Sequence, residues 1–547
     1  MSHCFLNSKK KFVSDALGGL VTTSAGSIAR LVTTDEDTQV IVRADWSKER
    51  VAVISGGGSG HEPTHPGFVG RGMLTAAVCG SVFASPSVSA ILSTIVHVTG
   101  PAGCLLVVKN YTGDRLNFGL AREVAKSKFN LKVEMVIVSD DIAIPGSAQP
   151  RGIAGTLLVH KIAGAKADTG ANLEDVLKVA HAAAEGVMSI GVALTDCHMP
   201  GEDTRVSRVA PGTMEVGLGI HGEPGAATVP IQTADDTVEA LVGKLREAAK
   251  KRGRELGRTA LLVNNLGTCM PSEMEIIANH AVSSVKPSLV VGPAALMTSL
   301  DMHGFSLTIL PLTDELEQLL RAPTAVSSWP TAKVPSPALS IFAPEIATES
   351  AKFVPSLNPL YRSRLEAACH AVISSENELN NLDSAVGDGD CGSTLAAGAR
   401  AVLSSSDEAP YGDGKDLALW LAEASDRIGG SSGVLAAIFF TGVAKTGDWS
   451  AAAIKAGVDS MTFYGGASVG SRTAMDALIP FADALLSGKS IEEAAERARE
   501  GAESTAKMAS ASHGRSANVP TEALMGRVDP GAVAVARVVK AIADVDE

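Results

Sequence analysis

The sequence predicts two units of different fold class, an α/β unit followed by an all-α unit. Three observations support this division of the 547 residues. From about residue 11 to 325, short β-branched apolar runs alternate with helical stretches. Seven prolines then fall between residues 323 and 359, where neither a helix nor a central strand can continue. After Leu360, apolar residues recur near every 3.6 positions and strand-like runs are nearly absent.

Four apolar runs in the first unit are expected to form buried strands: Val51–Ile54, Leu105–Val108, Val133–Val138 and Leu261–Val263. Ala-rich segments between them, such as Leu116–Ala125 and Leu177–Gly186, are expected to form helices. Strands and helices in alternation indicate an α/β fold with a mostly parallel sheet. In such folds, ligands bind at the loops that leave the carboxyl ends of strands. The loops after these strands are therefore candidate sites.

The proline-rich stretch at 322–359 is interpreted as an inter-domain linker. Beyond it, six segments have helical length and spacing: Tyr361–Ser374, Leu417–Ile428, Trp449–Phe463, Thr473–Leu486, Ile491–Met508 and Ala532–Asp546. Pro480 is expected to kink or divide the fourth of these helices. Glycine-rich interruptions lie between the helices, and loops gathered at one end of a helix bundle can form a ligand site.

The bulk composition excludes several classes of protein. A net charge of −13 disfavours nucleic acid or an anionic membrane as a partner. Seven cysteines, without C-x-x-C pairs or histidines at zinc spacing, argue against a disulfide framework and against structural zinc. No apolar run approaches 18 residues, and the first ten residues lack the apolar region of a signal peptide. We therefore expect a cytoplasmic protein with reduced thiols.

Residues 382–394, Leu-Asp-Ser-Ala-Val-Gly-Asp-Gly-Asp-Cys-Gly-Ser-Thr, carry the strongest functional signal. Asp383, Asp388 and Asp390 would repel one another unless a hard cation such as Mg²⁺ binds between them. The interleaved glycines permit a tight turn. Ser393 and Thr394 offer hydroxyl and N–H groups of the kind that hold phosphate at a helix N-terminus. The segment thus indicates a Mg–nucleotide site.

The same segment has alternative interpretations. Gly387-x-Gly389-x-x-Gly392 matches the dinucleotide fingerprint, but the intervening aspartates would repel a pyrophosphate unless a metal intervened. An EF-hand loop that starts at Asp388 fails, because Gly392 and Ala399 occupy its fifth and twelfth positions. A solvated acidic surface loop is the alternative without function.

A glycine loop from Ser55 to Pro63 directly follows the first predicted strand. Such a loop presents backbone N–H groups to a polar ligand, and His61 could help to bind a small hydroxylated molecule. No Gly-Lys-Ser/Thr follows the glycines, so the loop is not a Walker A motif. A histidine on a solvated turn is equally compatible with these residues alone.

Two further segments place polar groups among glycines. Lys109 and Asp114 follow the second predicted strand, where a carboxylate can accept a proton from a substrate hydroxyl, although a surface ion pair is the alternative. His221 lies close to Glu223, and an imidazole can act as a nucleophile toward a carbonyl carbon, although a structural histidine is the alternative. The Gly-x-Gly-x-x-Gly match around His221 is interpreted as coincidental, because Pro-Gly follows Glu223 and no helix can open there.

Taken together, these segments resemble the single-chain, ATP-dependent dihydroxyacetone kinases, the triokinase-like family. The matching strings, in the family's order, are SGGGSGHEPTHPGFVGRGML (55–74), SPS (85–87), VKNYTGDRLNFGLA (108–121), GLGIHGEPG (217–225), NNLG (264–267), LDSAVGDGDCGST (382–394), GGSSG (429–433), GRS (514–516) and DPGA (529–532). The resemblance implies an α/β substrate-binding domain of two subdomains at 1–333, a linker at 334–359 and an all-α nucleotide-binding domain at 360–547. That domain would be an antiparallel barrel of eight helices. A homodimer is also implied.

The resemblance also implies roles for individual residues. His221 would hold the substrate carbonyl as a hemiaminal, and Asp114 and His61 would be the other catalytic residues. Substrate contacts are implied for Gly57, Gly58, Ser59, Gly60 and Lys109. Nucleotide contacts are implied for Cys391, Gly392, Ser393, Thr394, Ser431, Ser432, Arg472, Thr473, Asp529, Pro530 and Gly531. Asp383, Asp388 and Asp390 would hold Mg²⁺, with two ions implied.

The activity implied is phosphorylation of dihydroxyacetone by ATP, with D-glyceraldehyde as a second substrate because its aldehyde can form the same adduct. An alternative is a lyase that splits FAD to cyclic FMN with Mn²⁺ at the same carboxylates. A non-enzymatic dihydroxyacetone sensor is a third hypothesis, and the second domain with all three aspartates counts against it. A phosphoenolpyruvate-fed system normally places the two domains on separate subunits.

Two positions depart from the family pattern. Ser471 stands where members often have an aspartate, in Gly-Asp-Arg-Thr-Met, and Asn518 stands where they have a tyrosine, in Gly-Arg-Ala-Ser-Tyr. The contacts of those two family side chains therefore cannot be transferred to this chain.

Overall fold

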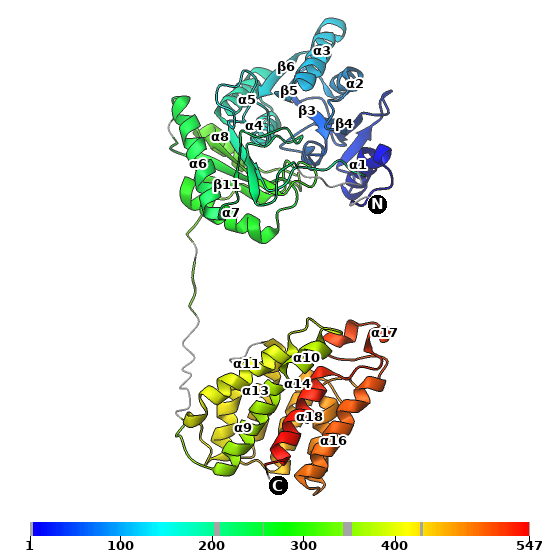
Figure 1. The fold of residues 1–547 in the computed structure, drawn as a ribbon. Helices are drawn as coiled ribbons and strands as arrows, with labels where there is room; N and C mark the ends of the chain where they lie inside the picture. Colours follow the sequence, from blue (N-terminus) through cyan, green and yellow to red (C-terminus); the bar gives the residue numbers. More distant parts are fainter. Residues whose placement is uncertain are drawn as a thin grey trace. The chain divides into compact units, whose positions relative to one another are not determined.

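The computed structural model of the chain describes residues 4–201, 208–254, 256–337, 339–342, 353–426 and 430–545. The chain divides into two compact units, residues 1–339 and 340–547, which Figure 1 shows as an α/β unit and a helical unit. Among the described residues, no helix combines the length and the apolar character needed to cross a membrane.

The first sheet of unit 1 has six strands in the order β1-β2-β4-β3-β5-β6. The strands are β1 Ile28–Leu31, β2 Gln39–Arg43, β3 Ala52–Ser59, β4 Ala76–Val82, β5 Cys104–Lys109 and β6 Val133–Val138. The four strands β4, β3, β5 and β6 are parallel, and β1 and β2 add an antiparallel edge. Helices α2 (Val88–Val98) and α3 (Thr112–Phe129) cover one face of this sheet. Helices α1 (Phe12–Thr23), α4 (Thr156–Asp168) and α5 (Leu173–Gly186) pack on the other.

The second sheet also has six strands, in the order β11-β10-β12-β7-β8-β9. The strands are β7 Met188–Ala193, β8 Thr213–Val216, β9 Ala227–Pro230, β10 Thr259–Asn265, β11 Leu289–Ala294 and β12 Gly304–Pro311. Helices α6 (Ala234–Lys251) and α7 (Pro271–Val285) cover one face. The other face shares one apolar core with α4, α5 and α8 (Asp314–Arg321), so these helices join the two sheets. The buried core therefore makes the two subdomains one unit.

The expectation of a mostly parallel sheet is correct for the first sheet and wrong for the second. In the second sheet only β10 and β11 are parallel, and they are connected through α7. The pairs β10–β12, β12–β7, β7–β8 and β8–β9 are antiparallel. An apolar run in the sequence shows that a strand is buried, but its direction depends on which neighbour it pairs with.

The four predicted strands are confirmed as parts of β3, β5, β6 and β10, and the two predicted helices as parts of α3 and α5. The proline-rich stretch is not a linker from its start. Trp329 is 5% exposed and packs edge-on against Phe68, and the backbones of Lys333 and Val290 exchange hydrogen bonds. Residues 323–333 therefore belong to unit 1. Residues 338 and 343–352 of the predicted linker lie outside the described residues.

Unit 2 is all-α, as predicted, and no strand occurs among its described residues. Its helices are α9 Pro359–Ser374, α10 Glu376–Asp383, α11 Cys391–Ser404, α12 Gly414–Asp426, α13 Gly430–Ala444, α14 Ala451–Gly465, α15 Met475–Leu486, α16 Ile491–Ser504, α17 Thr521–Leu524 and α18 Pro530–Ala543. From α11 to α16 each helix packs on the next, α16 packs on α18, α18 on α9 and α9 on α11. This closed ring of eight helices is the predicted barrel.

Four helices of unit 2 were not predicted. In α11 and α13 the glycine and serine residues of the first turn mask the apolar spacing, whereas α10 and α17 are too short to show it. The prediction for Leu417–Ile428 extends to residues 427–428, and that for Ala532–Asp546 to residue 546, which lie outside the described residues. Pro480 does not divide α15. It leaves the carbonyl of Asp476 without its usual helical donor, and Gly501 of α16 lies close to that carbonyl because it lacks a side chain.

Candidate functional site

The first candidate site lies at the carboxyl ends of two neighbouring parallel strands. Gly57 lies in β3, Lys109 ends β5 and Asp114 lies in the first turn of α3. A Cβ atom on Gly57 would lie 3.3 Å from Oδ2 of Asp114, 3.3 Å from Cε of Lys109 and 3.4 Å from Nε2 of His65. Glycine therefore leaves a space between three polar side chains, which any other residue would fill.

The other residues of the predicted glycine loop face the protein. A Cβ atom on Gly58 or Gly60 would come within 2.8 Å of Phe83. The hydroxyl of Ser59 donates to the carbonyl of Gly80 in the neighbouring strand, at 2.7 Å. These three residues position the loop, whereas Gly57 opens the pocket.

His61 is fully buried beside this pocket. Its Nδ1 lies 2.8 Å from the carbonyl oxygen of Thr298. Because a carbonyl only accepts, Nδ1 carries the hydrogen and Nε2 keeps its lone pair. Burial lowers the pKa of His61 well below its usual value, with the charge of Lys109 acting in the same direction. His61 is thus a neutral base whose Nε2 has no partner among the described residues.

His221 is held in a defined tautomer by Glu223. The imidazole Nδ1 lies 2.9 Å from Oε1 of Glu223, and the backbone N–H of His221 donates to Oε2 at 2.9 Å. Burial alone would raise the pKa of Glu223, but the hydrogen bond and charge of His221 outweigh it and lower the pKa to about 2. Glu223 is therefore a carboxylate that accepts the hydrogen of Nδ1, which leaves Nε2 as the ring nitrogen available to a ligand. Gly219 permits this contact, because a Cβ atom there would lie 1.9 Å from Oε2 of Glu223.

Aromatic rings enclose His221 on several sides. Its ring centroid lies 4.7 Å from that of Tyr111, 5.0 Å from that of His61 and 5.1 Å from that of Phe83, all at steep interplanar angles. The loop that carries His221 is fixed from both sheets: Ser299 donates to the carbonyl of Ile220 at 2.5 Å, and Arg151 donates to the carbonyl of Gly217 at 2.7 Å. The imidazole therefore has little freedom to turn.

Lys109 and Asp114 lie on the other side of the pocket, and both are buried. Burial raises the pKa of Asp114, and Lys109 and a hydrogen bond from Ser85 oppose this rise. The Ser85 hydroxyl donates to Oδ1 of Asp114 at 2.5 Å, which leaves Oδ2 toward Gly57. Burial lowers the pKa of Lys109, while Asp114 and Glu223 oppose that change. This pair is not the solvated surface pair that the sequence left open.

His65, which sequence reasoning missed, completes the pocket. Ser55 donates its only hydroxyl hydrogen to the carbonyl of Val107 at 2.7 Å. Its oxygen therefore accepts from Nδ1 of His65 at 3.2 Å and from Nε2 of His160 at 2.9 Å. Nε2 of His65 keeps a lone pair and lies toward the space at Gly57. The string GHEPTHP contained this histidine, but only the fold shows which ring nitrogen is free.

The pocket gathers polar atoms that the protein itself does not satisfy. Nε2 of His61, Nε2 of His65, Nζ of Lys109 and the hydroxyl of Tyr111 are buried without a hydrogen-bond partner among the described residues. Each buried unsatisfied group costs about 1–3 kcal/mol, so such a cluster calls for an explanation. A small, polyhydroxylated ligand that brings its own donors and acceptors provides one.

The second candidate site lies between α10 and α11 in unit 2. Carboxylate oxygens of Asp383, Asp388 and Asp390 lie within 4.8 Å of one another. Asp383 is buried, and its Oδ2 accepts the backbone N–H groups of Gly389 at 2.9 Å, Asp390 at 3.1 Å and Cys391 at 3.2 Å. The other two aspartates are exposed. A cluster of carboxylates with one buried member and two exposed ones fits Mg²⁺, which takes few protein ligands and keeps positions for phosphate and water.

The predicted phosphate-contact residues begin α11. Cys391, Gly392, Ser393 and Thr394 form its first turn, with Asp390 at the N-cap position. Asn380 of α10 fixes this turn: its Oδ1 accepts the N–H of Ser393 at 3.0 Å, and its amide donates to the Ser393 hydroxyl at 2.9 Å. Asn380 was missed because an asparagine within a helix carries no distinctive signal.

Arg472 and Asp529 bring two other predicted segments together. Burial raises the pKa of Asp529 to about 6, and the charge of Arg472 opposes that rise. A Cβ atom on Gly531 would lie 3.5 Å from the backbone nitrogen of Ala474, so the two loops are in contact. Arg472 is buried and donates to the carbonyl of Arg527 at 2.9 Å, while its Nε and Nη1 have no partner among the described residues. Two free guanidinium nitrogens form a receptor for an anion such as phosphate.

The remaining nucleotide-contact residues are placed as follows. Thr473 donates its N–H to Oδ2 of Asp476 at 2.8 Å, and Pro530 starts α18. Ser471, the first departure, has its hydroxyl bonded to the N–H of Ser468 at 3.0 Å. Ser431 and Ser432 are exposed in the first turn of α13. The hydrogen bonds of the described residues do not connect these two serines to the carboxylates.

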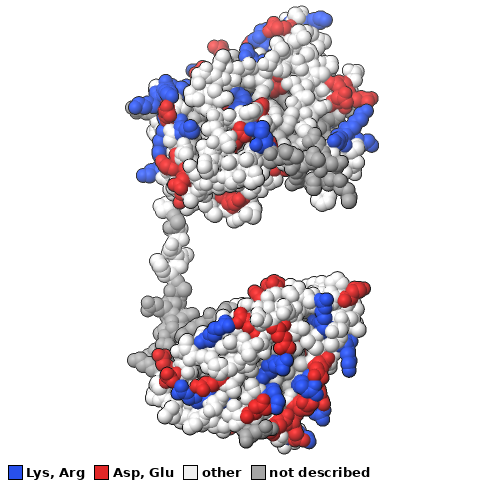
Figure 2. Space-filling model, viewed as in Figure 1, with Lys and Arg blue, Asp and Glu red and all other residues white. Residues whose placement is uncertain are grey.

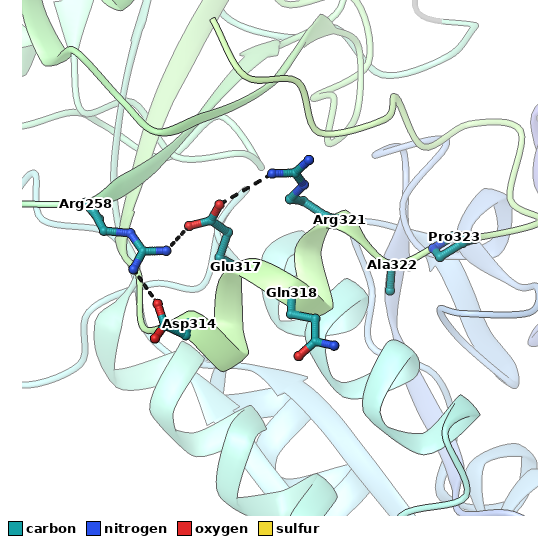
Figure 3. A pocket seen from close by; sticks show the side chains of 7 residues that line it. All are labelled: Arg258, Asp314, Glu317, Gln318, Arg321, Ala322 and Pro323. Atoms are coloured by element: carbon teal, nitrogen blue, oxygen red, sulfur yellow. Dashed lines mark hydrogen bonds and ion pairs between the residues drawn. The ribbon is translucent and has the colours of Figure 1, made fainter.

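Charged side chains on the molecular surface are mixed and paired, unlike those in the two sites. On the face drawn in Figure 2, acidic and basic side chains intermingle on each unit. A surface hollow of about 560 Å³ lies beside α8. The side chains drawn in Figure 3 show that Arg258 pairs there with Asp314 and Glu317, and Arg321 with Glu317. The charges of the hollow are paired with one another, so the hollow lacks the unsatisfied buried groups of the pocket around His221.

Comparison with known proteins identifies the family of both units. The Dak1 domain model matches residues 23–328, and the DAK2 domain model matches residues 385–544. The dihydroxyacetone kinase of Citrobacter freundii is 45% identical, over 100% of this chain and 99% of its own. The human triokinase/FMN cyclase is 37% identical, over 99% of this chain and 98% of its own.

A solved structure extends the comparison to the fold. The C. freundii dihydroxyacetone kinase in complex with AMP-PNP and Mg²⁺ matches with a TM-score of 0.81 and 44% identity, over 100% of both chains. Both domain models, the full-length identity and the fold lead to one conclusion. The chain belongs to the dihydroxyacetone kinase family.

Proposed function

We propose that the protein transfers the γ-phosphoryl group of ATP to a hydroxyl of dihydroxyacetone, which His221 holds through its carbonyl carbon. The observation that carries this proposal is the Glu223–His221 pair, whose imidazole ring lies against Tyr111 and His61, two of the residues with unsatisfied buried polar atoms. The names of the relatives support the substrate and the phosphoryl donor.

Capture of the substrate needs only groups in the pocket and solvent. Nε2 of His221 attacks the carbonyl carbon, and the C=O π bond becomes a C–O single bond. Glu223 takes the hydrogen from Nδ1 as the ring would become positive and releases it to solvent, while the former carbonyl oxygen gains one proton from solvent, so that Glu223 is again a carboxylate. The product is a neutral hemiaminal, so charge and protons balance. Glycerol has no carbonyl and cannot form it.

Phosphoryl transfer then requires a base at the substrate hydroxyl. Oδ2 of Asp114 lies beside the open space at Gly57 and can accept that proton, with neutral His61 nearby. In unit 2, Asp383, Asp388 and Asp390 would hold Mg²⁺, which neutralises charge on the triphosphate oxygens. Positioning and charge neutralisation supply most of the catalysis in such transfers.

A coupled assay of ADP release tests the proposal. We expect turnover with dihydroxyacetone and with D-glyceraldehyde, and much slower turnover with glycerol at equal concentration. Glycerol turnover as fast as that of dihydroxyacetone would rule out carbonyl capture. No ADP release with any of the three would rule out the kinase.

A second activity, the splitting of FAD to cyclic FMN, is also proposed, because relatives at 37–38% identity carry the name triokinase/FMN cyclase. It would use the aspartates of unit 2 and leave His221 unused. Incubation with FAD and Mn²⁺, followed by chromatography, tests it. Absence of cyclic FMN at enzyme concentrations that phosphorylate dihydroxyacetone would contradict it.

The rate should fall in acid as Asp114 becomes protonated, because the base must be ionised. Since burial raises the pKa of Asp114, this fall should lie above the ordinary value of 3.8. Ser85→Ala removes a hydrogen bond that lowers this pKa, so it should move the acid limb of kcat/KM upward by about one pH unit. Ser87→Ala is the matched control, because that hydroxyl caps α2 and accepts from Ala90. If kcat/KM falls at the same acid pH in Ser85→Ala and Ser87→Ala, a group other than Asp114 is the base.

Arg472→Met should weaken binding of Mg–ADP by about 10- to 100-fold, the loss expected for one charged hydrogen-bonding group. Isothermal titration of the full-length protein measures the change, and the melting temperature monitors folding. Arg497→Met is the control, since Arg497 pairs with Glu500 on the exposed face of α16. Equal affinity in the Arg472 variant and the wild type would exclude Arg472 as a phosphate contact.

A further inference from the structure

Three metal-ligating side chains that belong to neither proposed site meet beside the second sheet of unit 1. Cys269 lies in the loop after β10, Glu273 in the first turn of α7 and His303 directly before β12. One ligand atom from each of the three lies within 4.8 Å of the others. We propose that Cys269, Glu273 and His303 form a binding site for a thiophilic divalent cation of the zinc class.

The contacts of the three residues already hold the ligand atoms together. Nε2 of His303 lies 3.1 Å from Oε2 and 3.2 Å from Oε1 of Glu273. The N–H of Met270 also donates to Oε2 of Glu273 at 2.7 Å, which fixes that carboxylate at the start of α7. Sγ of Cys269 lies 3.2 Å from the carbonyl of Gly304, the residue after His303. These hydrogen bonds therefore connect the loop of Cys269, the N-terminus of α7 and the loop before β12.

The chemistry of the set selects the cation. One thiolate, one carboxylate and one neutral imidazole carry a charge of −2, which a divalent cation cancels. The sulfur and nitrogen ligands favour Zn²⁺ over Mg²⁺ or Ca²⁺, which require oxygen ligands. Three protein ligands are the usual number at zinc sites that keep a fourth position open.

The fourth coordination position of the cation would face an apolar hollow. All three ligands line a hollow of about 210 Å³, together with apolar side chains that include Leu194, Met214, Ile231, Ile276 and Phe305. The side chains of Glu273 and His303 are 32% and 33% exposed, so a cation can enter from solvent. An apolar shell beside an accessible ligand set strengthens the charge interactions within it.

Titration of the chelator-treated, full-length protein with Co²⁺, in excess Mg²⁺, tests the site. Co²⁺ replaces Zn²⁺ spectroscopically, and a cysteine ligand gives an intense thiolate-to-metal charge-transfer band. We expect one equivalent of Co²⁺ to produce this band and Zn²⁺ to abolish it. Cys269→Ser should remove the band, and both Cys269→Ser and His303→Gln should weaken Zn²⁺ binding by about 100-fold or more.

Cys391→Ser is the matched control, because Cys391 directly follows Asp390 of the carboxylate cluster in unit 2. This variant should keep the band. The proposal is wrong if the wild type gives no thiolate band, if the band persists in Cys269→Ser, or if Cys391→Ser abolishes it. Circular dichroism of the two ligand variants confirms folding, so that loss of the band reports on the metal.

Discussion

Asp388→Asn is expected to lower ATP-dependent phosphorylation by about two to three decades. The change keeps the shape of an exposed side chain and removes one of three carboxylates that lie within 4.8 Å. Loss of one charge partner at a metal costs on the order of 2–5 kcal/mol, which corresponds to this range of rates. Asp383 is a poorer choice for the test, because it also accepts three backbone N–H groups and its loss would disturb the loop.

The measurement compares kinase turnover, FAD splitting and substrate capture in one preparation of Asp388→Asn. The first two should fall together, because both would depend on the same carboxylates, while capture at His221 in unit 1 should be unchanged. Asp459→Asn, which removes an exposed carboxylate paired with Lys455 on α14, should retain full turnover. If Asp388→Asn keeps its kinase turnover at saturating Mg²⁺, these aspartates are not the metal ligands.

His221→Ala should lower kcat/KM for dihydroxyacetone on the order of 100-fold or more, because the substrate would no longer be fixed in a reactive position. The slow phosphorylation of glycerol should be unchanged, so the preference for dihydroxyacetone over glycerol should largely disappear. A crystal of the wild type soaked with dihydroxyacetone should show continuous density between the substrate and Nε2. Separate density, together with full activity of the variant, would refute capture.

Glu223→Gln tests the role of Glu223 in capture while the imidazole ring of His221 stays in position. It exchanges a charged acceptor at Nδ1 for a neutral one, which costs about 1–1.5 kcal/mol, or roughly tenfold in rate. Because glutamine can hold the ring but cannot take the hydrogen from Nδ1, we expect a lower occupancy of the adduct in the soaked crystal, with the imidazole still in place. His280→Ala is a suitable control, since His280 also faces carboxylates, 3.4 Å from Asp235 and 3.8 Å from Glu239, but lies on α7.

The sequence predicted the elements of the fold better than their arrangement. The run Val133–Val138 coincides with β6, and Val51–Ile54 overlaps the start of β3, because a buried strand leaves an apolar run in the sequence. The antiparallel order of the second sheet was not predictable, since strand direction is set by partners far apart in the chain. Helix α13 was missed because its first turn reads Gly-Ser-Ser-Gly.

The same distinction holds for the sites. His221, Lys109 and Asp114 were found because they sit in unusual strings, and the fold places them around one pocket. His65 depends on the hydrogen bonds of Ser55, which no string reveals. The set of Cys269, Glu273 and His303 has no short-range pattern in the sequence, because His303 lies 34 positions after Cys269 and only the fold brings the two together.

The closed ring of unit 2 has a consequence for how that unit tolerates cutting and rejoining. Because α18 packs on both α9 and α16, the last helix is as much a part of the wall as any other. Loss of the fourteen residues of α18 would therefore leave two neighbouring helices uncovered. Truncation before α18 should destabilise unit 2 as much as removal of an internal helix. Conversely, because the first and last helices of the ring touch, the packing of the ring does not depend on the loop in which the chain begins and ends. Circular permutants of unit 2, with new ends placed in a loop remote from the aspartates, should assemble the same wall.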